Sequence, residues 1–156
     1  RPAGAVRDQP LDLGPVVLID DSYNSNPASA GAALLTLREL KGDRRAIAVL
    51  GDMLELGEEG LAAHRDVGQL AANCVERLYL YGAMGEAVAA AALEAGMAES
   101  EVVCVASHDE IVQDIVKDHL DGDYILVKGS RGMRMDLVSA ALRETFSSPD
   151  YSGGRS

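Results

Sequence analysis

The residues with the clearest chemical potential lie in the stretch LIDDSYNSNPAS, residues 18–29. An apolar run ends there, and a carboxylate, a phenol and two amides follow it at Asp21, Tyr23, Asn24 and Asn26. Carboxylate and amide oxygens accept hydrogen bonds from ligand hydroxyls, and a flat aromatic ring can cover a bound molecule. We therefore expect this stretch to contribute to a binding site.

A purely structural role is the alternative for several of these residues. Asn26 followed by Pro27 is typical of a helix N-cap with proline at the first helical position, which does not exclude a ligand contact. Asp20 and Asp21 could equally cap loop amides. Because adjacent side chains of a strand point in opposite directions, at most one of these two carboxylates should face a ligand.

A second stretch, KGSRGMRMD at residues 128–136, concentrates positive charge in an acidic chain. Lys128, Arg131 and Arg134 surround two glycines where we expect a helix to begin, and the net charge of the chain is −11. A helix N-terminus with cations around it favours an anion. The pattern is not a nucleotide-binding Walker A loop, because here the lysine precedes the glycines. The alternative is a set of solvated surface charges.

The third unusual stretch is GDMLELGEEG, residues 51–60, with a histidine one turn into the following helix. Glu58 and Glu59 lie near the expected helix start, where the helix dipole favours acidic residues. A lone helical histidine such as His64 is most often a surface or packing residue. No second histidine lies nearby, so we expect no histidine-based metal site.

These three stretches have to be positioned by a parallel sheet. Five short apolar segments lack strict alternation, as is typical of strands covered on both faces: 16–20, 46–50, 77–81, 102–105 and 124–128. Helical periods separate them, including one that contains Ala30, Leu34 and Leu37 and another that starts at the capping sequence SHDE, residues 107–110. The pattern predicts an α/β fold: a Rossmann-like, three-layer α/β/α domain with a mainly parallel sheet of about six strands. The strand order is not readable.

Ligands of open α/β sheets bind beyond the carboxyl ends of the strands, and all three polar stretches follow such ends. We expect residues 1–15 to be an interdomain linker with a lead-in strand, 16–146 to form the domain, and 147–156 to be a disordered tail. The two thiols, Cys74 and Cys104, are both expected to be buried and reduced.

Charge and hydropathy argue against several classes of partner. With 14 basic and 25 acidic residues in 156, the chain should repel nucleic acid and anionic membrane surfaces. No apolar run reaches the length that spans a bilayer, and residues 1–15 lack the apolar core of a signal peptide. We therefore expect no nucleic-acid partner and no membrane insertion.

Together, DDSYNSNPAS, VLGDMLELGEEG followed by HRDVG, and VKGSRGMRMD resemble, in order and spacing, the C-terminal domain of the Mur ligases. The resemblance runs from about residue 16 to 142 and is closest to the ligases that add D-alanyl-D-alanine. Two positions depart mildly: Ser25 stands where alanine is more frequent, and Asp136 where glutamate is common.

The resemblance implies a cytoplasmic, three-domain, ATP-dependent enzyme of peptidoglycan synthesis that joins D-alanyl-D-alanine to UDP-N-acetylmuramoyl-tripeptide. In that family the N-terminal and central domains hold the sugar peptide, most of the ATP site and Mg²⁺. This domain would close over ATP and position the dipeptide, without a catalytic residue or metal site of its own, and would be inactive alone.

For individual residues, the resemblance implies ATP contacts for Asp21, Tyr23, Asn24 and Asn26, with Asp21 on the ribose and Tyr23 on the base. It implies contacts to the dipeptide carboxylate or the ATP phosphates for three further residues, namely Lys128, Ser130 and Arg131.

Two other classes of α/β protein share part of this pattern. A receiver-type phosphoacceptor domain also has an acidic pair after the first strand and a lysine after the fifth, but it needs an aspartate where Tyr81 ends the third strand. A flavodoxin-like nucleotide-binding module would have a phosphate loop richer in glycine than SYNSNP.

Overall fold

The structure, a computed structural model, describes residues 9–149 and 151. It has one six-stranded sheet with the order β1-β2-β6-β3-β4-β5. The strands are β1 (Leu11–Asp12), β2 (Val16–Asp21), β3 (Ala46–Gly51), β4 (Arg77–Tyr81), β5 (Val102–Val105) and β6 (Asp123–Lys128). Strand β1 is antiparallel to β2, and the other pairs are parallel. The predicted fold class is confirmed.

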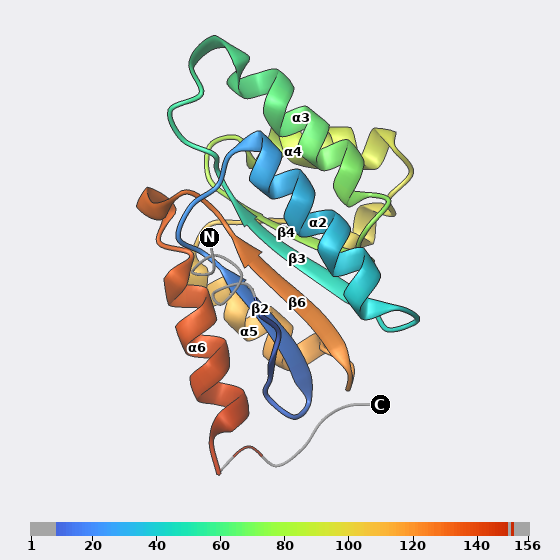
Figure 1. Cartoon of the computed structure of the whole chain (residues 1–156), viewed down its shortest axis with the longest axis vertical. Coiled ribbons are helices and arrows are strands. Elements are labelled where there is room, and N and C mark those ends of the chain that lie inside the picture. The colour runs from blue at the N-terminus through green and yellow to red at the C-terminus, as the bar shows by residue number, and fades with distance from the viewer. Residues whose placement is uncertain (1–8, 150, 152–156) are drawn as a thin grey trace.

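Helices cover both faces of the sheet. On one face lie α2 (Pro27–Lys41), α3 (Gly60–Ala71) and α4 (Gly85–Glu94); on the other lie α5 (His108–Asp118) and α6 (Asp136–Ser147). Figure 1 shows α2 in front of the sheet and α5 behind it. The core is correspondingly split into two apolar clusters, one on each side of the strands. Strands covered in this way are buried on both faces, which explains their continuous apolar runs.

Local hydrogen bonds explain where two helices begin. Asn26 caps α2: its Oδ1 accepts the Ser29 amide at 2.9 Å, and the Ser29 hydroxyl oxygen accepts the Asn26 amide at 3.0 Å. Ser107 caps α5 by accepting the Glu110 amide at 3.2 Å. Both caps agree with the sequence signals, and each satisfies amides that lack a partner within the helix.

The last helix begins later than expected. Residues Arg131–Met133 form a 3₁₀ turn, Arg134 is left-handed with φ 54°, and α6 starts only at Asp136. The helical pattern of the sequence predicts the last helix at residues 134–145, so the predicted start at Arg134 is wrong. A residue with positive φ cannot continue a right-handed helix, so the turn is separated from α6.

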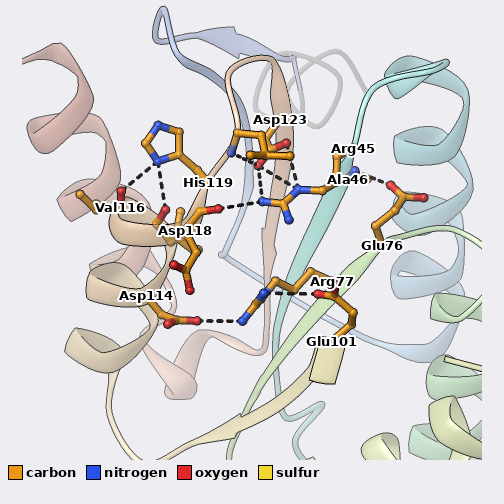
Figure 2. Close-up of polar contacts among 12 residues, drawn as sticks. Arg45, Ala46, Glu76, Arg77, Glu101, Asp114, Val116, Asp118, His119 and Asp123 are labelled. Atoms are coloured by element: carbon orange, nitrogen blue, oxygen red, sulfur yellow. Dashed lines mark hydrogen bonds and ion pairs between the residues drawn. The ribbon is translucent and has the colours of Figure 1, made fainter. Parts of the chain in front are cut away.

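Ion pairs and hydrogen bonds connect the amino ends of the central strands (Figure 2). The buried Asp123 of β6 accepts Arg45 Nη2 at 2.7 Å, and the same guanidinium reaches the Asp118 carbonyl at 3.2 Å. Glu76, before β4, accepts the Ala46 amide of β3 at 2.7 Å. These contacts connect β3, β4 and β6 at the end of the sheet opposite the three polar stretches.

Three further expectations concern the thiols, the chain ends and membrane insertion. Cys74 is buried, but Cys104 is exposed because it lies on β5, the edge strand, so the expectation of two buried thiols is wrong for Cys104. Residues 1–8, 150 and 152–156 of the linker and tail lie outside the described part, whereas Tyr151 packs edge-on against Phe146, with its hydroxyl 2.9 Å from His119 Nε2. Within the described ranges, no helix is long and apolar enough to cross a membrane.

Candidate functional site

The strand order brings the three polar stretches together. Strands β2, β6 and β3 are neighbours, so the loops that follow them leave the same edge of the sheet side by side. We call residues 21–26 loop 1, residues 51–60 loop 2 and residues 128–135 loop 3. At β6 the connections also change from one face of the sheet to the other, the position where open α/β sheets bind ligands.

Ser130 of loop 3 is the point where the three loops are joined. Its Oγ accepts the Leu54 amide of loop 2 at 2.8 Å and lies 3.4 Å from the Ser25 carbonyl of loop 1. Its own amide donates to the Asp52 carbonyl at 3.1 Å. A hydroxyl that is buried and already bonded in this way has a fixed orientation, so any ligand contact it makes depends on the geometry of loop 2.

Lys128 lies in a different environment from the one the sequence suggests. Its side chain is only 2% exposed, and its ammonium donates to Asp21 Oδ2 at 2.5 Å and to the Asn24 carbonyl at 3.0 Å. Asp21 and Lys128 are register partners on β2 and β6, which explains why they meet. Lys128 therefore connects loop 1 to β6 by an ion pair instead of presenting a free charge.

The two adjacent carboxylates point in opposite directions, as expected of a strand end. Asp21 faces Lys128, whereas Asp20 accepts the Ser139 hydroxyl of α6 at 2.9 Å and Arg143 Nη2 at 3.2 Å. Asp20 is thus used to attach α6 to β2. Asp21 is the carboxylate on the side of loop 1 that faces α2.

A pocket of about 240 Å³ lies between β2 and α2, next to Asp21. Its polar end is formed by Asp21, Asn24 and Lys128, while the rest is mainly small and apolar: Ile19, Ser29, Ala32, Ala33 and Thr36. A hollow with an apolar body and a few converging polar groups is the usual form of a small-molecule site.

The structure does not bring all four proposed ATP contacts into this pocket. Tyr23 lines a separate hollow of about 310 Å³ on the α6 side, with Asp20 and Arg143. Asn26 uses its side-chain oxygen to cap α2, and Asn24 uses its oxygen to accept the Ser25 amide at 2.9 Å. Asp21 and Asn24 are therefore the two members that share one pocket.

Arg131 is the cation of loop 3 that remains available. It is exposed, and none of the described residues forms an ion pair or hydrogen bond with its guanidinium. Arg134, by contrast, donates to Asp136 at 2.9 and 3.0 Å, and these bonds lower the pKa of the Asp136 carboxyl. The N-terminus of α6 is thus occupied by an acidic residue. An anion at loop 3 would depend on Arg131, not on the helix end.

Close backbone contacts explain the glycines of this edge. A Cβ at Gly129 would lie 2.7 Å from Met135 Cγ and 3.2 Å from the Gly51 Cα, so only glycine lets β3 and β6 approach beneath the buried Met135. Gly132 similarly makes room for Leu54, whose Cδ1 would lie 3.0 Å from an added Cβ. Loops 2 and 3 are in direct contact as a result.

His64 was left without a specific role by the sequence, and the structure gives it one. It is 3% exposed; its Nε2 is 3.0 Å from the Met53 amide and its Nδ1 is 2.7 Å from the Gly60 carbonyl. The available signal was its spacing, because His64 precedes the buried Val67 and Ala71 by three and seven residues on one face of α3.

The described residues contain no group of three or more histidine, cysteine, aspartate or glutamate side chains able to hold a metal ion. Two carboxylates of these loops are bonded to protein groups: Asp21 accepts the Lys128 ammonium, and Asp52 Oδ1 accepts the Met84 amide at 3.1 Å.

Comparison with known proteins finds Mur ligases along most of the chain, in agreement with the resemblance seen in the sequence. The family model "Mur ligase, glutamate ligase domain" matches residues 7–131. A UDP-N-acetylmuramoyl-tripeptide–D-alanyl-D-alanine ligase of Bacillus subtilis is 32% identical over 129 residues, covering 82% of this chain and 28% of the relative. The ligase of the same name from Escherichia coli is 37% identical over 129 residues, covering 82% of this chain and 27% of the relative. The chain thus spans a little over a quarter of these relatives.

Solved structures show the same fold. A MurF ligase of Thermotoga maritima in complex with ADP superposes with a TM-score of 0.75 at 22% identity, covering 90% of this chain and 31% of that chain. A MurF of Acinetobacter baumannii gives 0.70 at 25% identity, covering 88% and 30%. The receiver-type and flavodoxin-like alternatives receive no support from these matches. The chain belongs to the Mur ligase family, as its glutamate ligase domain.

Proposed function

We propose that this chain is the C-terminal domain of an ATP-dependent ligase that joins D-alanyl-D-alanine to UDP-N-acetylmuramoyl-tripeptide. In this reaction ATP transfers its terminal phosphoryl group to the tripeptide carboxylate. The dipeptide amine then attacks the acyl carbon and phosphate leaves, so that an amide bond forms. The match to curated ligases of this one specificity, at 32–37% identity, carries the proposal.

We assign Asp21 and Asn24 to the nucleotide side of the site. Their support is the pocket of about 240 Å³ between β2 and α2, with its apolar body and polar end. Asp21 keeps a second carboxylate oxygen for a ribose hydroxyl while Oδ2 binds Lys128. Tyr23, in the neighbouring hollow, and Asn26, at the start of α2, are proposed to contact ATP from the rim of loop 1.

Ser130 and Arg131 are assigned to the incoming dipeptide. A guanidinium and a carboxylate can form two parallel charge-assisted hydrogen bonds, and the exposed Arg131 has no competing carboxylate among the described residues. Lys128 contributes to this site by fixing loop 1 against β6 through Asp21.

Other parts of the reaction are assigned to the remainder of a longer ligase. The described residues offer no cluster suited to Mg²⁺, so we propose that Mg²⁺ and the catalytic groups belong to the central ATPase domain, and the sugar peptide mainly to the N-terminal one. We also propose a cytoplasmic location, where the nucleotide-linked substrate and ATP are present.

The test is to assay a ligase that carries this domain with ATP, UDP-N-acetylmuramoyl-tripeptide and D-alanyl-D-alanine, and to detect the product by mass spectrometry. The proposal predicts a pentapeptide product that requires all three substrates. Efficient ligation of a single amino acid in place of the dipeptide, with no pentapeptide formed, would contradict the assigned specificity.

A further inference from the structure

His64 stands at the start of a chain of hydrogen bonds that ends at Ser130, 66 positions away in the sequence. The Met53 amide donates to His64 Nε2 at 3.0 Å, and the next amide, that of Leu54, donates to Ser130 Oγ at 2.8 Å. The Ser130 amide in turn donates to the carbonyl of Asp52, the residue before Met53, at 3.1 Å. Three consecutive residues of loop 2 thus lie between the histidine and the serine.

The bonding partners also define the tautomer of His64. A backbone amide only donates, so Nε2 must accept from Met53, and the ring proton must lie on Nδ1, which donates to the Gly60 carbonyl at 2.7 Å. The two ring nitrogens therefore form two different hydrogen bonds, and a substitution can remove one of them while keeping the other. Nδ1 attaches the ring to the first turn of α3, and Nε2 attaches that helix to loop 2.

Few other hydrogen bonds fix the backbone of loop 2 in this region. It follows β3, and its residues Leu54 to Leu56 lie outside the helices and strands, with Glu55 at φ 63°. A segment with so little regular structure depends on individual hydrogen bonds for its position. His64 is nearly fully buried beneath it and supplies one of these bonds from the rigid helix α3.

We propose that His64 is a positioning residue for the dipeptide site. By accepting the Met53 amide through Nε2, it fixes residues 52–54 and thereby the orientation of the Ser130 hydroxyl and of the adjoining Arg131. This inference rests on the proposed function, because it takes Ser130 and Arg131 as the residues that meet the dipeptide.

Two substitutions separate the two tasks of the ring. The side-chain amide of His64→Gln places its oxygen near the position of Nε2 and retains an acceptor for Met53. The shorter His64→Asn places its NH₂ group near the position of Nδ1 and retains only the bond to Gly60. Both are polar and neutral, so a general effect of losing the imidazole should appear in both.

Backbone amide exchange in the 156-residue chain, followed by NMR, tests the structural step. We expect the amides of Met53, Leu54 and Ser130 to exchange roughly two- to tenfold faster in His64→Asn than in His64→Gln, the usual effect of one lost hydrogen bond. The amide of Leu126 in β6, which reports global unfolding, should not separate the two variants. Equal exchange at Ser130 in both variants would overturn the inference.

Steady-state kinetics of a ligase that carries the domain test the functional step. His64→Asn should raise the KM for D-alanyl-D-alanine several-fold above that of His64→Gln, with the KM for ATP unchanged. If the two variants share one dipeptide KM while Ser130→Ala raises it, His64 is not a positioning residue. If Ser130→Ala and Arg131→Ala both leave the dipeptide KM unchanged, the proposed dipeptide site fails, whereas the exchange result still decides the role of His64 in the fold.

Discussion

Removing the Asp21 carboxylate should destabilise the domain more than removing its partner, the Lys128 ammonium. The side chain of Lys128 is 2% exposed and that of Asp21 is 19% exposed. In Asp21→Ala the ammonium stays buried with only the Asn24 carbonyl, at 3.0 Å, as an acceptor. In Lys128→Met the apolar chain still fills the space, and the remaining carboxylate lies close enough to solvent to be hydrated.

The expected magnitudes follow from this asymmetry. Breaking a buried ion pair so that one charge is left uncompensated typically costs about 3–5 kcal/mol. The loss of a hydrogen bond to a charged group costs about 1.5–3 kcal/mol, which we expect for Lys128→Met. At about 2–4 °C per kcal/mol for a domain of this size, Asp21→Ala should lower the Tm by roughly 6–20 °C.

Urea and thermal unfolding of the chain, followed by circular dichroism, measure these effects. The decisive variant is the double mutant Asp21→Ala/Lys128→Met, which removes the orphaned ammonium and should be at least about 1 kcal/mol more stable than Asp21→Ala alone. As a control, Glu94→Ala breaks the exposed pair with Arg65 and should cost about 1 kcal/mol or less. If the double mutant were as unstable as the sum of the single mutants, our description of a buried, coupled pair would be refuted.

Three further changes test other parts of the structure. Asp123→Ala removes the buried acceptor of Arg45 at the amino ends of the strands and should lower the free energy of unfolding by about 3 kcal/mol. A Tm equal to that of the unchanged protein within experimental error would contradict the ion pair of Figure 2. In native protein an aromatic disulfide reagent should modify the exposed Cys104 and not the buried Cys74, and equal modification of both thiols would refute this difference in exposure. Because partial desolvation raises the pKa of Cys104, its rate of modification should still be increasing at pH 9. Gly129→Ala places a methyl 2.7 Å from a methionine carbon and should destabilise by about 1–3 kcal/mol, whereas an unchanged Tm would show that the loops can separate at no cost.

Most of the sheet could be predicted because strands covered on both faces are short apolar runs with clear ends. The five expected parallel strands agree with the structure to within one residue at each end. The strand order could not be predicted, because it depends on which helices cover which face, and that is decided by packing between segments distant in sequence. The start of α6 was misplaced because the left-handed conformation of Arg134 has no glycine to signal it.

The candidate site was predictable as a set of loops and not as a set of contacts. The carboxyl-end rule was sufficient to group loops 1, 2 and 3. The pairing of Asp21 with Lys128 requires both the adjacency of β2 and β6 and their register, neither of which is visible in the sequence. For this reason Lys128 was expected to bind an anionic ligand, whereas Arg131, with the same sign of charge, is the residue left exposed.

The central claim, that loop 3 receives the carboxylate of the dipeptide at Arg131, is tested most directly by the kinetics of Arg131→Ala in a ligase that carries this domain. We expect kcat/KM for D-alanyl-D-alanine to fall roughly tenfold to a hundredfold, the effect of losing about 1.5–3 kcal/mol of charge-assisted hydrogen bonding. Phosphoryl transfer to the tripeptide, measured without dipeptide, should stay nearly intact because the amine arrives after that step.

Arg131→Lys should recover only part of the loss, since lysine cannot form the two parallel bonds. The matched control is Arg134→Ala, which removes a cation of the same loop that is already paired with Asp136 and should change kcat/KM only slightly. Loss of phosphoryl transfer in Arg131→Ala with an unchanged dipeptide KM would contradict the account and assign Arg131 to the ATP phosphates.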